Sequence, residues 1–147
     1  MSRIDVMIDI ETLGTNECPP VFQLVAKAFD LKTGEIISIF QDCCDVSTST
    51  SPIDEATVVW WTKTNFRLFV KLLADGVNSG NTEEQMIKNF INWFESLDKD
   101  NKNVFLWGNG VNFDNRIIAA KCMQYGLFYP VFYLFVYSLQ RDYLYGR

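Results

Sequence analysis

Residues 4–15, with the sequence IDVMIDIETLGT, limit the possible folds of this chain more than any other segment. The apolar side chains predict a strand over residues 4–10, and Gly14 belongs to the turn that ends it. Side chains two positions apart on a strand share a face, so Asp9 and Glu11 project together. We expect an inner strand of a sheet, in which these two neighbouring carboxylates are buried.

Two carboxylates this close raise each other's pKa unless a cation lies between them. Mg²⁺ and Mn²⁺ bind carboxylate oxygens and keep water in their remaining positions, so a divalent metal is the simplest partner for Asp9 and Glu11. The alternative is a solvated strand end, because the Asp-x-Glu pattern is common by chance. The Thr-Leu-Gly-Thr turn that follows the apolar strand favours the metal.

The composition of the chain narrows its chemistry. The 147 residues include no histidine, which excludes Ser-His-Asp and Cys-His mechanisms and requires another general base. Four cysteines without a C-x-x-C pair argue against zinc sites of the usual kind. A net charge of −5 argues against broad electrostatic binding of nucleic acid. It does not exclude an acidic metal site that acts on a phosphodiester.

The length and the 48% hydrophobic content are typical of one globular domain. Acidic residues interrupt the apolar N-terminal stretch, so it does not resemble a signal peptide. The apolar run at residues 129–139 is shorter than the roughly 20 residues needed to span a bilayer. We therefore expect a cytoplasmic protein with no membrane partner.

Two further strands are predicted at residues 22–30 and 36–40. The polar segment between them contains Gly34 and suits a hairpin turn. The chain therefore begins with three consecutive antiparallel strands. Residues 41–51 are polar and rich in Ser and Thr, which predicts a loop.

The next segment predicts two helices. Ser51 as a cap and Pro52 at the first helical position indicate a short helix that runs through Trp61. A second helix is expected to reach Ala74, followed by a loop over residues 75–81 that contains two glycines.

Thr82 begins a capping-box pattern, T-E-E-Q, ahead of the clearest helix in the chain. The apolar residues of this helix recur at helical spacing: Met86, Ile87, Phe90, Ile91, Phe94 and Leu97. A short strand over residues 104–107, a glycine break and a helix over residues 112–125 then form a parallel crossover pattern. The inward face of that last helix is expected to comprise Phe113, Ile117, Ala120 and Met123.

Residues 7–15 (MIDIETLGT) resemble the first motif, D-x-E-T, of the DEDD superfamily of 3′-5′ exonucleases. Residues 109–114 (NGVNFD) fit the second motif, and residues 51–61 (SPIDEATVVWW) resemble the corresponding segment of phage and prophage exonucleases. The resemblance covers residues 4–126. It implies an α/β, ribonuclease-H-like fold: a mixed sheet whose first three strands are antiparallel, with flanking helices on both faces.

The resemblance also implies a metal-dependent 3′-5′ exonuclease that uses two Mg²⁺ or Mn²⁺ ions. Asp9 would bridge the two ions, and Glu11 would bind one of them and orient the attacking water. Asp114 would complete the metal shell from its helix. Thr12 and Leu13, just past the strand, would touch the terminal nucleotide.

The resemblance places Asn109 at the substrate site, close to Trp107. Phe113 is expected in the core rather than stacked on a base, because apolar helix residues are usually buried. The expected substrate is a single-stranded 3′ end of DNA or RNA. Since the chain is acidic, metals and stacking rather than a basic cleft would carry the binding.

The third motif of the family carries His or Tyr, followed four or five residues later by an acid. Tyr137 and Asp142 have this spacing, but they lie where the family places a strand. One interpretation is an exonuclease with an unusual third motif. A second is a C-terminally truncated homologue, weak or inactive, that binds metal or nucleic acid.

A third interpretation is a non-enzymatic interaction module. Its exposed apolar edge would be covered by a partner, or by a second copy in a homo-oligomer. Intact first and second motifs count against this interpretation. We divide the chain into an exonuclease domain at residues 1–128 and a Tyr-rich strand or tail at residues 129–147, where the fold would be incomplete.

Overall fold

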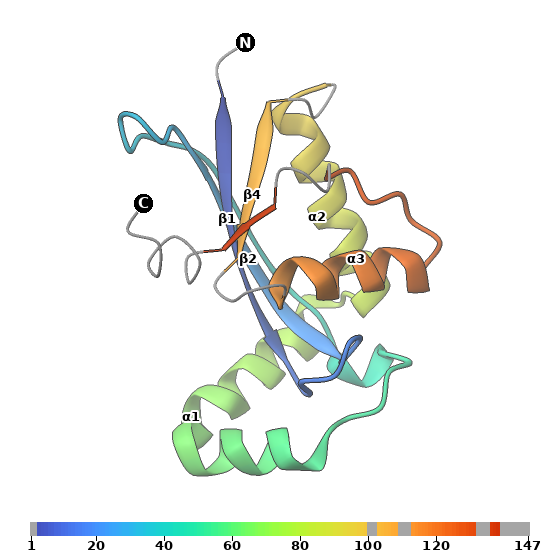
Figure 1. The fold of residues 1–147 in the computed structure, drawn as a ribbon. Coiled ribbons are helices and arrows are strands. Elements are labelled where there is room, and N and C mark those ends of the chain that lie inside the picture. The colour runs from blue at the N-terminus through green and yellow to red at the C-terminus, as the bar shows by residue number, and fades with distance from the viewer. Residues whose placement is uncertain (1–2, 100–102, 109–112, 132–135, 139–147) are drawn as a thin grey trace.

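The computed structural model describes residues 3–99, 103–108, 113–131 and 136–138 (Figure 1). In this part of the chain, five strands form one mixed sheet with the order β3-β2-β1-β4-β5. The strands are β1 (Ile4–Thr12), β2 (Val21–Phe29), β3 (Ile36–Cys43), β4 (Val104–Gly108) and β5 (Val136–Ser138).

The pairing of the strands confirms the predicted fold class. β1 pairs with β2 and β2 with β3, both antiparallel. β4 runs parallel to β1 on its other side, and β5 runs parallel to β4. The first three strands therefore form the expected antiparallel meander, and the chain returns through helices to add parallel strands.

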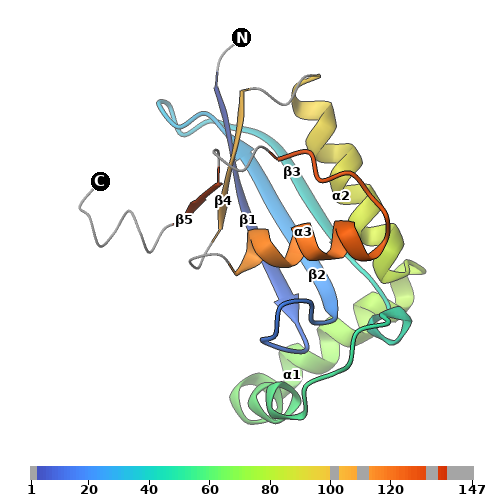
Figure 2. The ribbon, with the colours of Figure 1, turned by 45° about the vertical axis from the view of Figure 1, so that its right-hand side comes forward.

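Three helices and one 3₁₀ turn connect these strands: η1 (Val46–Thr48), α1 (Glu55–Ser79), α2 (Glu83–Leu97) and α3 (Asp114–Gln124). α2 and α3 lie on one face of the sheet, and α3 crosses in front of β1 and β2 in Figure 2. α1 lies at the carboxyl end of β1 (Figure 1). No helix in the described residues is both long and apolar enough to cross a membrane.

The main core lies between the sheet and the two helices α2 and α3. Alternate residues of β1, namely Val6, Ile8 and Ile10, are buried there, as the strand period requires. The predicted apolar face of α2 meets them, with every predicted residue buried except the partly buried Leu97. A second cluster joins α1 to the end of β1 and consists of Leu13, Phe22, Trp61, Phe69 and Leu72.

The start of α1 differs from the prediction. The helix begins at Glu55 and Asp54 is its cap, accepting hydrogen bonds from the Ala56 amide and the Thr57 hydroxyl. The predicted cap, Ser51, instead accepts a hydrogen bond from the Lys121 ammonium at 3.0 Å. A long-range partner therefore replaces the local role that sequence pattern suggested.

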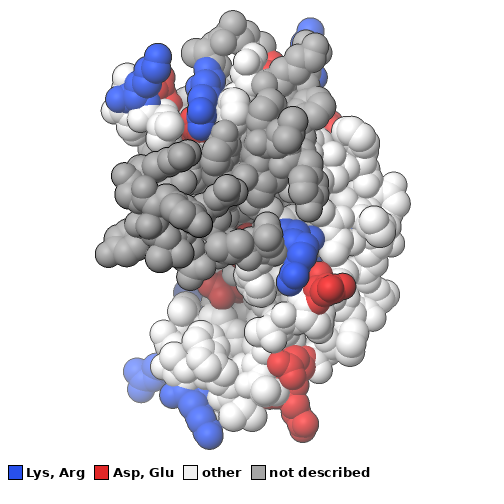
Figure 3. All heavy atoms as spheres, in the orientation of Figure 1, with Lys and Arg blue, Asp and Glu red and all other residues white. Residues whose placement is uncertain are grey.

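The predicted division of this helical segment is correct, but the predicted loop is wrong. Asn65 has non-helical backbone angles (φ −156°, ψ 72°) and divides α1 into two segments. The helix then continues through Ser79 to a left-handed Gly80, so most of residues 75–81 is helical. Gly76 is needed for close packing: a Cβ there would lie 2.1 Å from the Cys44 carbonyl oxygen. Figure 3 shows Lys and Arg side chains at the surface over this helix.

Thr82 caps α2 as predicted, accepting from the Gln85 amide at 3.1 Å. The predicted inward face of α3 is only partly correct. Ile117 is buried, but Met123 is 84% exposed, and Lys121 is completely buried in its place. The polar Lys121 was missed because its partner, Glu83, lies on another helix.

Candidate active site

Asp9 and Glu11 lie on the face of β1 that points away from the main core, as their spacing predicts. The expectation that both are buried is wrong. Asp9 is exposed and Glu11 is partly buried, because α2 and α3 cover only the opposite face of this strand. Both carboxylates can therefore be reached from solvent.

Asp5 is a further carboxylate on the same face of β1, and neighbouring residues neutralise it and fill its hydrogen bonds. Asp5 is fully buried and forms an ion pair with Arg3, whose Nη2 lies 2.7 Å from Asp5 Oδ1. Trp107 on β4 donates its indole N–H to the same oxygen at 2.8 Å. Trp107 thus holds Asp5 in place, and Asp5 is a structural residue.

Asp9 and Glu11 have perturbed pKa values. Partial burial raises the pKa of Asp9, against a hydrogen bond from the Ile10 amide that lowers it. The pKa of Glu11 is raised to about 7, chiefly by burial and then by the negative charges of Asp9 and Asp114. Asp114 is the first residue of α3 and is only 3% exposed. The fold therefore brings both Asp9 and Asp114 close enough to Glu11 to raise its pKa.

This donor set suits a divalent cation that prefers oxygen ligands, because a bound cation would remove the repulsion between the carboxylates. The described residues contain no group of three or more acidic, Cys or His side chains gathered tightly enough to hold an ion. The chemistry of Asp9, Glu11 and Asp114 fits a metal site, and their role as ligands stays a prediction.

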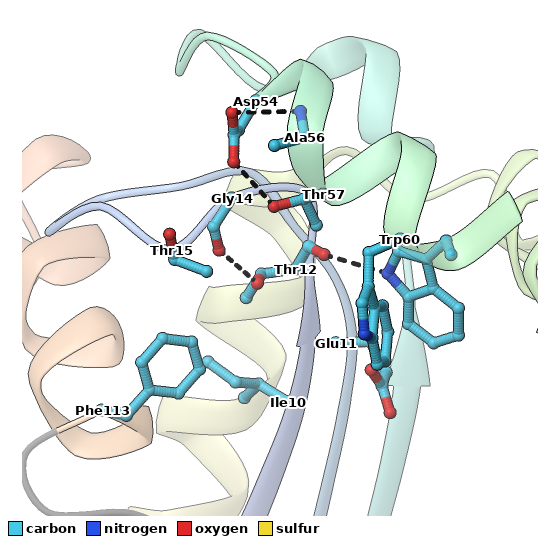
Figure 4. Close-up of a pocket in the computed structure, with 11 residues that line it drawn as sticks. Ile10, Glu11, Thr12, Gly14, Thr15, Asp54, Ala56, Thr57, Trp60 and Phe113 are labelled. Atoms are coloured by element: carbon cyan, nitrogen blue, oxygen red, sulfur yellow. Dashed lines mark hydrogen bonds between the residues drawn. The ribbon is translucent and has the colours of Figure 1, made fainter. Parts of the chain in front are cut away.

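A pocket of about 460 Å³ opens beside Glu11, between the end of β1 and the start of α1. Figure 4 shows Trp60 beside Glu11 on one side and Phe113 on the other, with Ile10 between them. Trp60 is 56% exposed, although it is a large aromatic side chain. Two aromatic side chains that line the same pocket offer an apolar wall to a planar ligand.

The predicted substrate residues are placed differently from one another. Thr12 lines the pocket, but its hydroxyl donates to the Gly14 carbonyl at 2.7 Å and its carbonyl accepts from the Trp61 indole at 3.4 Å. Leu13 is 3% exposed in the second cluster. Asn109 lies outside the described residues. Contact of these residues with a nucleotide stays a prediction.

Sequence reasoning missed Trp60 as a pocket residue and assigned Phe113 to the core alone. Phe113 does pack against the main core, but it also lines the pocket. The signal for Trp60 was the paired tryptophans in residues 51–61: one of the pair is buried in the second cluster and the other is exposed. Two adjacent helix positions cannot both face the core, so one of the two must point elsewhere.

The first residue of the candidate third motif, Tyr137, lies on a strand and not on the helix that the family resemblance implies. Tyr137 belongs to β5, paired with Trp107 of β4, which is the strand that the family resemblance places there. Asp142 lies outside the described residues. The Tyr137–Asp142 spacing therefore does not correspond to a helical third motif at Tyr137.

The strand order and the acidic end of the central strand fit the α/β, ribonuclease-H-like class of fold that the sequence predicts. The family model of the 3′-5′ exoribonuclease Rv2179c-like domain matches residues 4–143, and the chain belongs to this family. The predicted resemblance to 3′-5′ exonucleases is thereby confirmed at the level of the family. The phage or prophage type stays a prediction. No curated protein sequence matches the chain significantly.

Solved structures of exonuclease I have the same fold at low sequence identity. One in complex with the SSB C-terminus is 13% identical, with a TM-score of 0.69 over 99% of this chain and 30% of that chain. The zinc-bound complex of E. coli exonuclease I with single-stranded DNA is 13% identical, with a TM-score of 0.68 over the same shares. A complex of the E. coli enzyme with a dT13 oligonucleotide is 15% identical, with a TM-score of 0.61 over 86% of this chain and 25% of that chain. The chain spans less than a third of these exonuclease I chains.

Proposed function

We propose that this chain is a metal-dependent nuclease that releases nucleotides from single-stranded 3′ ends. The observation that carries this proposal is the position of Glu11, which lines an open pocket and has a raised pKa because of burial and the nearby charges of Asp9 and Asp114. Repelling carboxylates at an accessible strand end are unfavourable unless a cation is bound. The exoribonuclease family description supports RNA as the substrate to test first.

Asp9, Glu11 and Asp114 would hold two Mg²⁺ or Mn²⁺ ions. Bound ions of this kind supply an activated water and charge stabilisation at the attacking and leaving oxygens. In the hydrolysis, a water oxygen bonds to phosphorus, the bond from phosphorus to the 3′ oxygen breaks, and a nucleoside monophosphate leaves. Glu11 would hold one of the ions and orient that water.

The aromatic walls of the pocket would position the terminal nucleotide. A base that enters the pocket gains stacking with Trp60, which stands beside Glu11 (Figure 4), and Phe113 lines the same pocket. Stacking of this kind tolerates any base, which suits an enzyme that shortens strands of mixed sequence.

The test is an assay with 5′-labelled single-stranded RNA and DNA, in Mn²⁺ and in EDTA. We expect a ladder that shortens from the 3′ end in Mn²⁺ and disappears in EDTA. Asp9→Ala should reduce cleavage to background without unfolding the protein, because Asp9 is exposed and supports no core contact. Glu95→Ala is the matched control, since Glu95 is an exposed acid on α2, and it should retain full activity.

Cleavage that survives Asp9→Ala would refute the assignment of the acidic residues. Cleavage that resists EDTA would refute the metal mechanism. Binding of Mn²⁺ without any cleavage, seen as a higher thermal midpoint that Asp9→Ala abolishes, would leave a metal site but contradict the exonuclease activity.

A further inference from the structure

We propose that the strand 5′ of the terminal nucleotide runs along α1, where Lys63 and Arg67 contact its phosphates and Phe66 stacks on a base. This proposal rests on the proposed function, because it extends the substrate outward from the pocket at Glu11. The occupant is a single-stranded nucleic acid longer than two nucleotides.

The pocket defines which side of α1 faces the substrate. Ala56, Thr57 and Trp60 all line it, and Trp60 lies three or four positions after the other two. Helix residues at this spacing share a face. The next residue on that face is Lys63, three positions after Trp60, so the pocket-facing side of α1 becomes positively charged as it leaves the pocket.

Just beyond the kink in α1, the helix exposes further groups that can bind nucleic acid. Asn65 interrupts the helix, and its side chain accepts a hydrogen bond from the Leu68 amide at 3.2 Å, which starts the second segment. Phe66 and Arg67 stand in the first turn of that segment, and Phe66 is 57% exposed. An exposed aromatic ring between two cations is the combination that single-stranded nucleic acid binds, since the ring stacks on bases and the cations meet phosphates.

Lys63 and Arg67 have no charged partner among the described residues. In the part of the chain that the structure describes, neither side chain forms an ion pair or a hydrogen bond. Lys71, on the same helix, is neutralised by Asp75 at 2.6 Å. Figure 3 shows the basic side chains over α1 at the lower left of the molecule. In a chain of net charge −5, two unpaired cations beside the candidate active site indicate an anionic ligand.

The geometry predicts a dependence on substrate length. A helix rises about 1.5 Å per residue, so Lys63 lies about 4.5 Å along the first segment from Trp60. Arg67 lies beyond the kink, further from the pocket. A dinucleotide held at Trp60 is therefore too short to gain from Arg67, whereas a strand of ten nucleotides reaches the whole path.

The test compares a dinucleotide with a ten-nucleotide RNA in the double variant Lys63→Gln/Arg67→Gln. For the longer strand we expect KM to rise about tenfold and kcat to stay unchanged. The slope of log KM against log salt should fall by about 1.4, because each phosphate that is no longer neutralised removes about 0.7. Kinetics on the dinucleotide should not change. Lys32→Gln is the control, because Lys32 is exposed in the β2–β3 turn at the opposite end of the sheet (Figure 1).

A second measurement does not depend on cleavage. Fluorescence anisotropy of the ten-nucleotide RNA in Mn²⁺, with the two substitutions added to the Asp9→Ala variant, should show the same tenfold weaker binding. Equal binding with and without the two substitutions would overturn the proposed path. If the two substitutions weaken binding while the wild-type protein cleaves neither substrate, that combination would support the path and refute the exonuclease activity. Circular dichroism checks that the variants are folded.

Discussion

The carboxyl end of β1 and the junction of α2 and α3 both hold acidic side chains, but they differ in how the protein neutralises the negative charge. At the carboxyl end of β1, Asp9 and Glu11 face a third carboxylate, and no described Lys or Arg forms an ion pair with Asp9 or Glu11. At the junction of α2 and α3, Glu83 is completely buried, and so is its partner Lys121.

The junction satisfies its charges from within the protein. Glu83 accepts from the Lys121 ammonium at 2.9 Å, from the Tyr125 hydroxyl, and from the Val21 amide at 2.8 Å. Lys121 also donates to the Ser51 hydroxyl and to the Gln124 side-chain carbonyl. These bonds tie the starts of β2 and α2, the segment before α1 and the end of α3 together.

The difference distinguishes structural charge from functional charge. A buried ion whose hydrogen-bonding capacity is filled by the protein holds segments in register and has no need of a ligand. Carboxylates left to repel one another at an accessible end have their pKa values raised, and such groups gather at functional sites. Each prediction below tests one side of this comparison.

The largest effect is expected from Lys121→Met. The change leaves Glu83 buried without its cation, and breaking a buried ion pair from one side destabilises a protein by about 3–5 kcal/mol. The measurement is the free energy of unfolding in urea at pH 7. The unbranched methionine side chain fills most of the space of the lysine, so that loss of charge rather than a cavity accounts for the result.

The control for this variant is Lys121→Met combined with Glu83→Gln. Removing both charges should recover part of the lost stability, since a glutamine amide in place of the Glu83 carboxylate carries no buried negative charge. A single variant as stable as the wild type would show that the junction is not held by this pair.

The two regions also differ in how well the sequence predicts them. The period of two on β1 was enough to place Asp9 and Glu11 together on one face, and local apolar spacing was enough for α2. The junction was not predictable in this way, because Glu83 reads locally as the first residue of a capped helix. Its role depends on Lys121, 38 residues further along the chain.

The same limit explains the other errors in the predicted fold. Gly76 has the local character of a loop residue, yet it lies within α1, where the carbonyl of the distant Cys44 leaves no room for a Cβ. The closeness of Asp114 to Glu11 followed from family resemblance and not from any local pattern. Trp60 was missed because its exposure depends on which of two adjacent tryptophans the second cluster buries.

A smaller effect is expected from Glu11→Gln, and it appears as a change in pH dependence. The pKa of Glu11 rises from its usual value near 4.5 to about 7 in the folded protein. Between these values the folded state binds more protons than the unfolded state, so Glu11 makes stability fall as pH rises from about 5 to about 7. In EDTA, the variant should lack this part of the decline, as measured by urea unfolding across pH 4–8.

Adding Mn²⁺ to the wild-type protein sharpens this test. A metal ion favours the deprotonated carboxylate, so binding should release protons and offset the decline between about pH 5 and about pH 7. Glu11→Gln should bind Mn²⁺ more weakly and show little of this offset. The contrary result is a free energy of unfolding that, in EDTA, depends on pH identically in wild type and variant. Glu11 would then have an ordinary pKa, and the carboxylates at the end of β1 would not repel one another.

The smallest effect is expected from Lys88→Ala, which removes a surface ion pair on α2. Lys88 lies 3.7 Å from Glu84, one helical turn away, and both side chains are more than two-fifths exposed. Exposed pairs at this spacing contribute about 0.3–0.5 kcal/mol, and salt screens them. Urea unfolding in low and high salt should give a loss of that size, shrinking as salt is added. A loss comparable to that of Lys121→Met would mean that exposure does not separate the two pairs. The structural role of the Glu83–Lys121 pair would then not result from its burial and its filled hydrogen bonds.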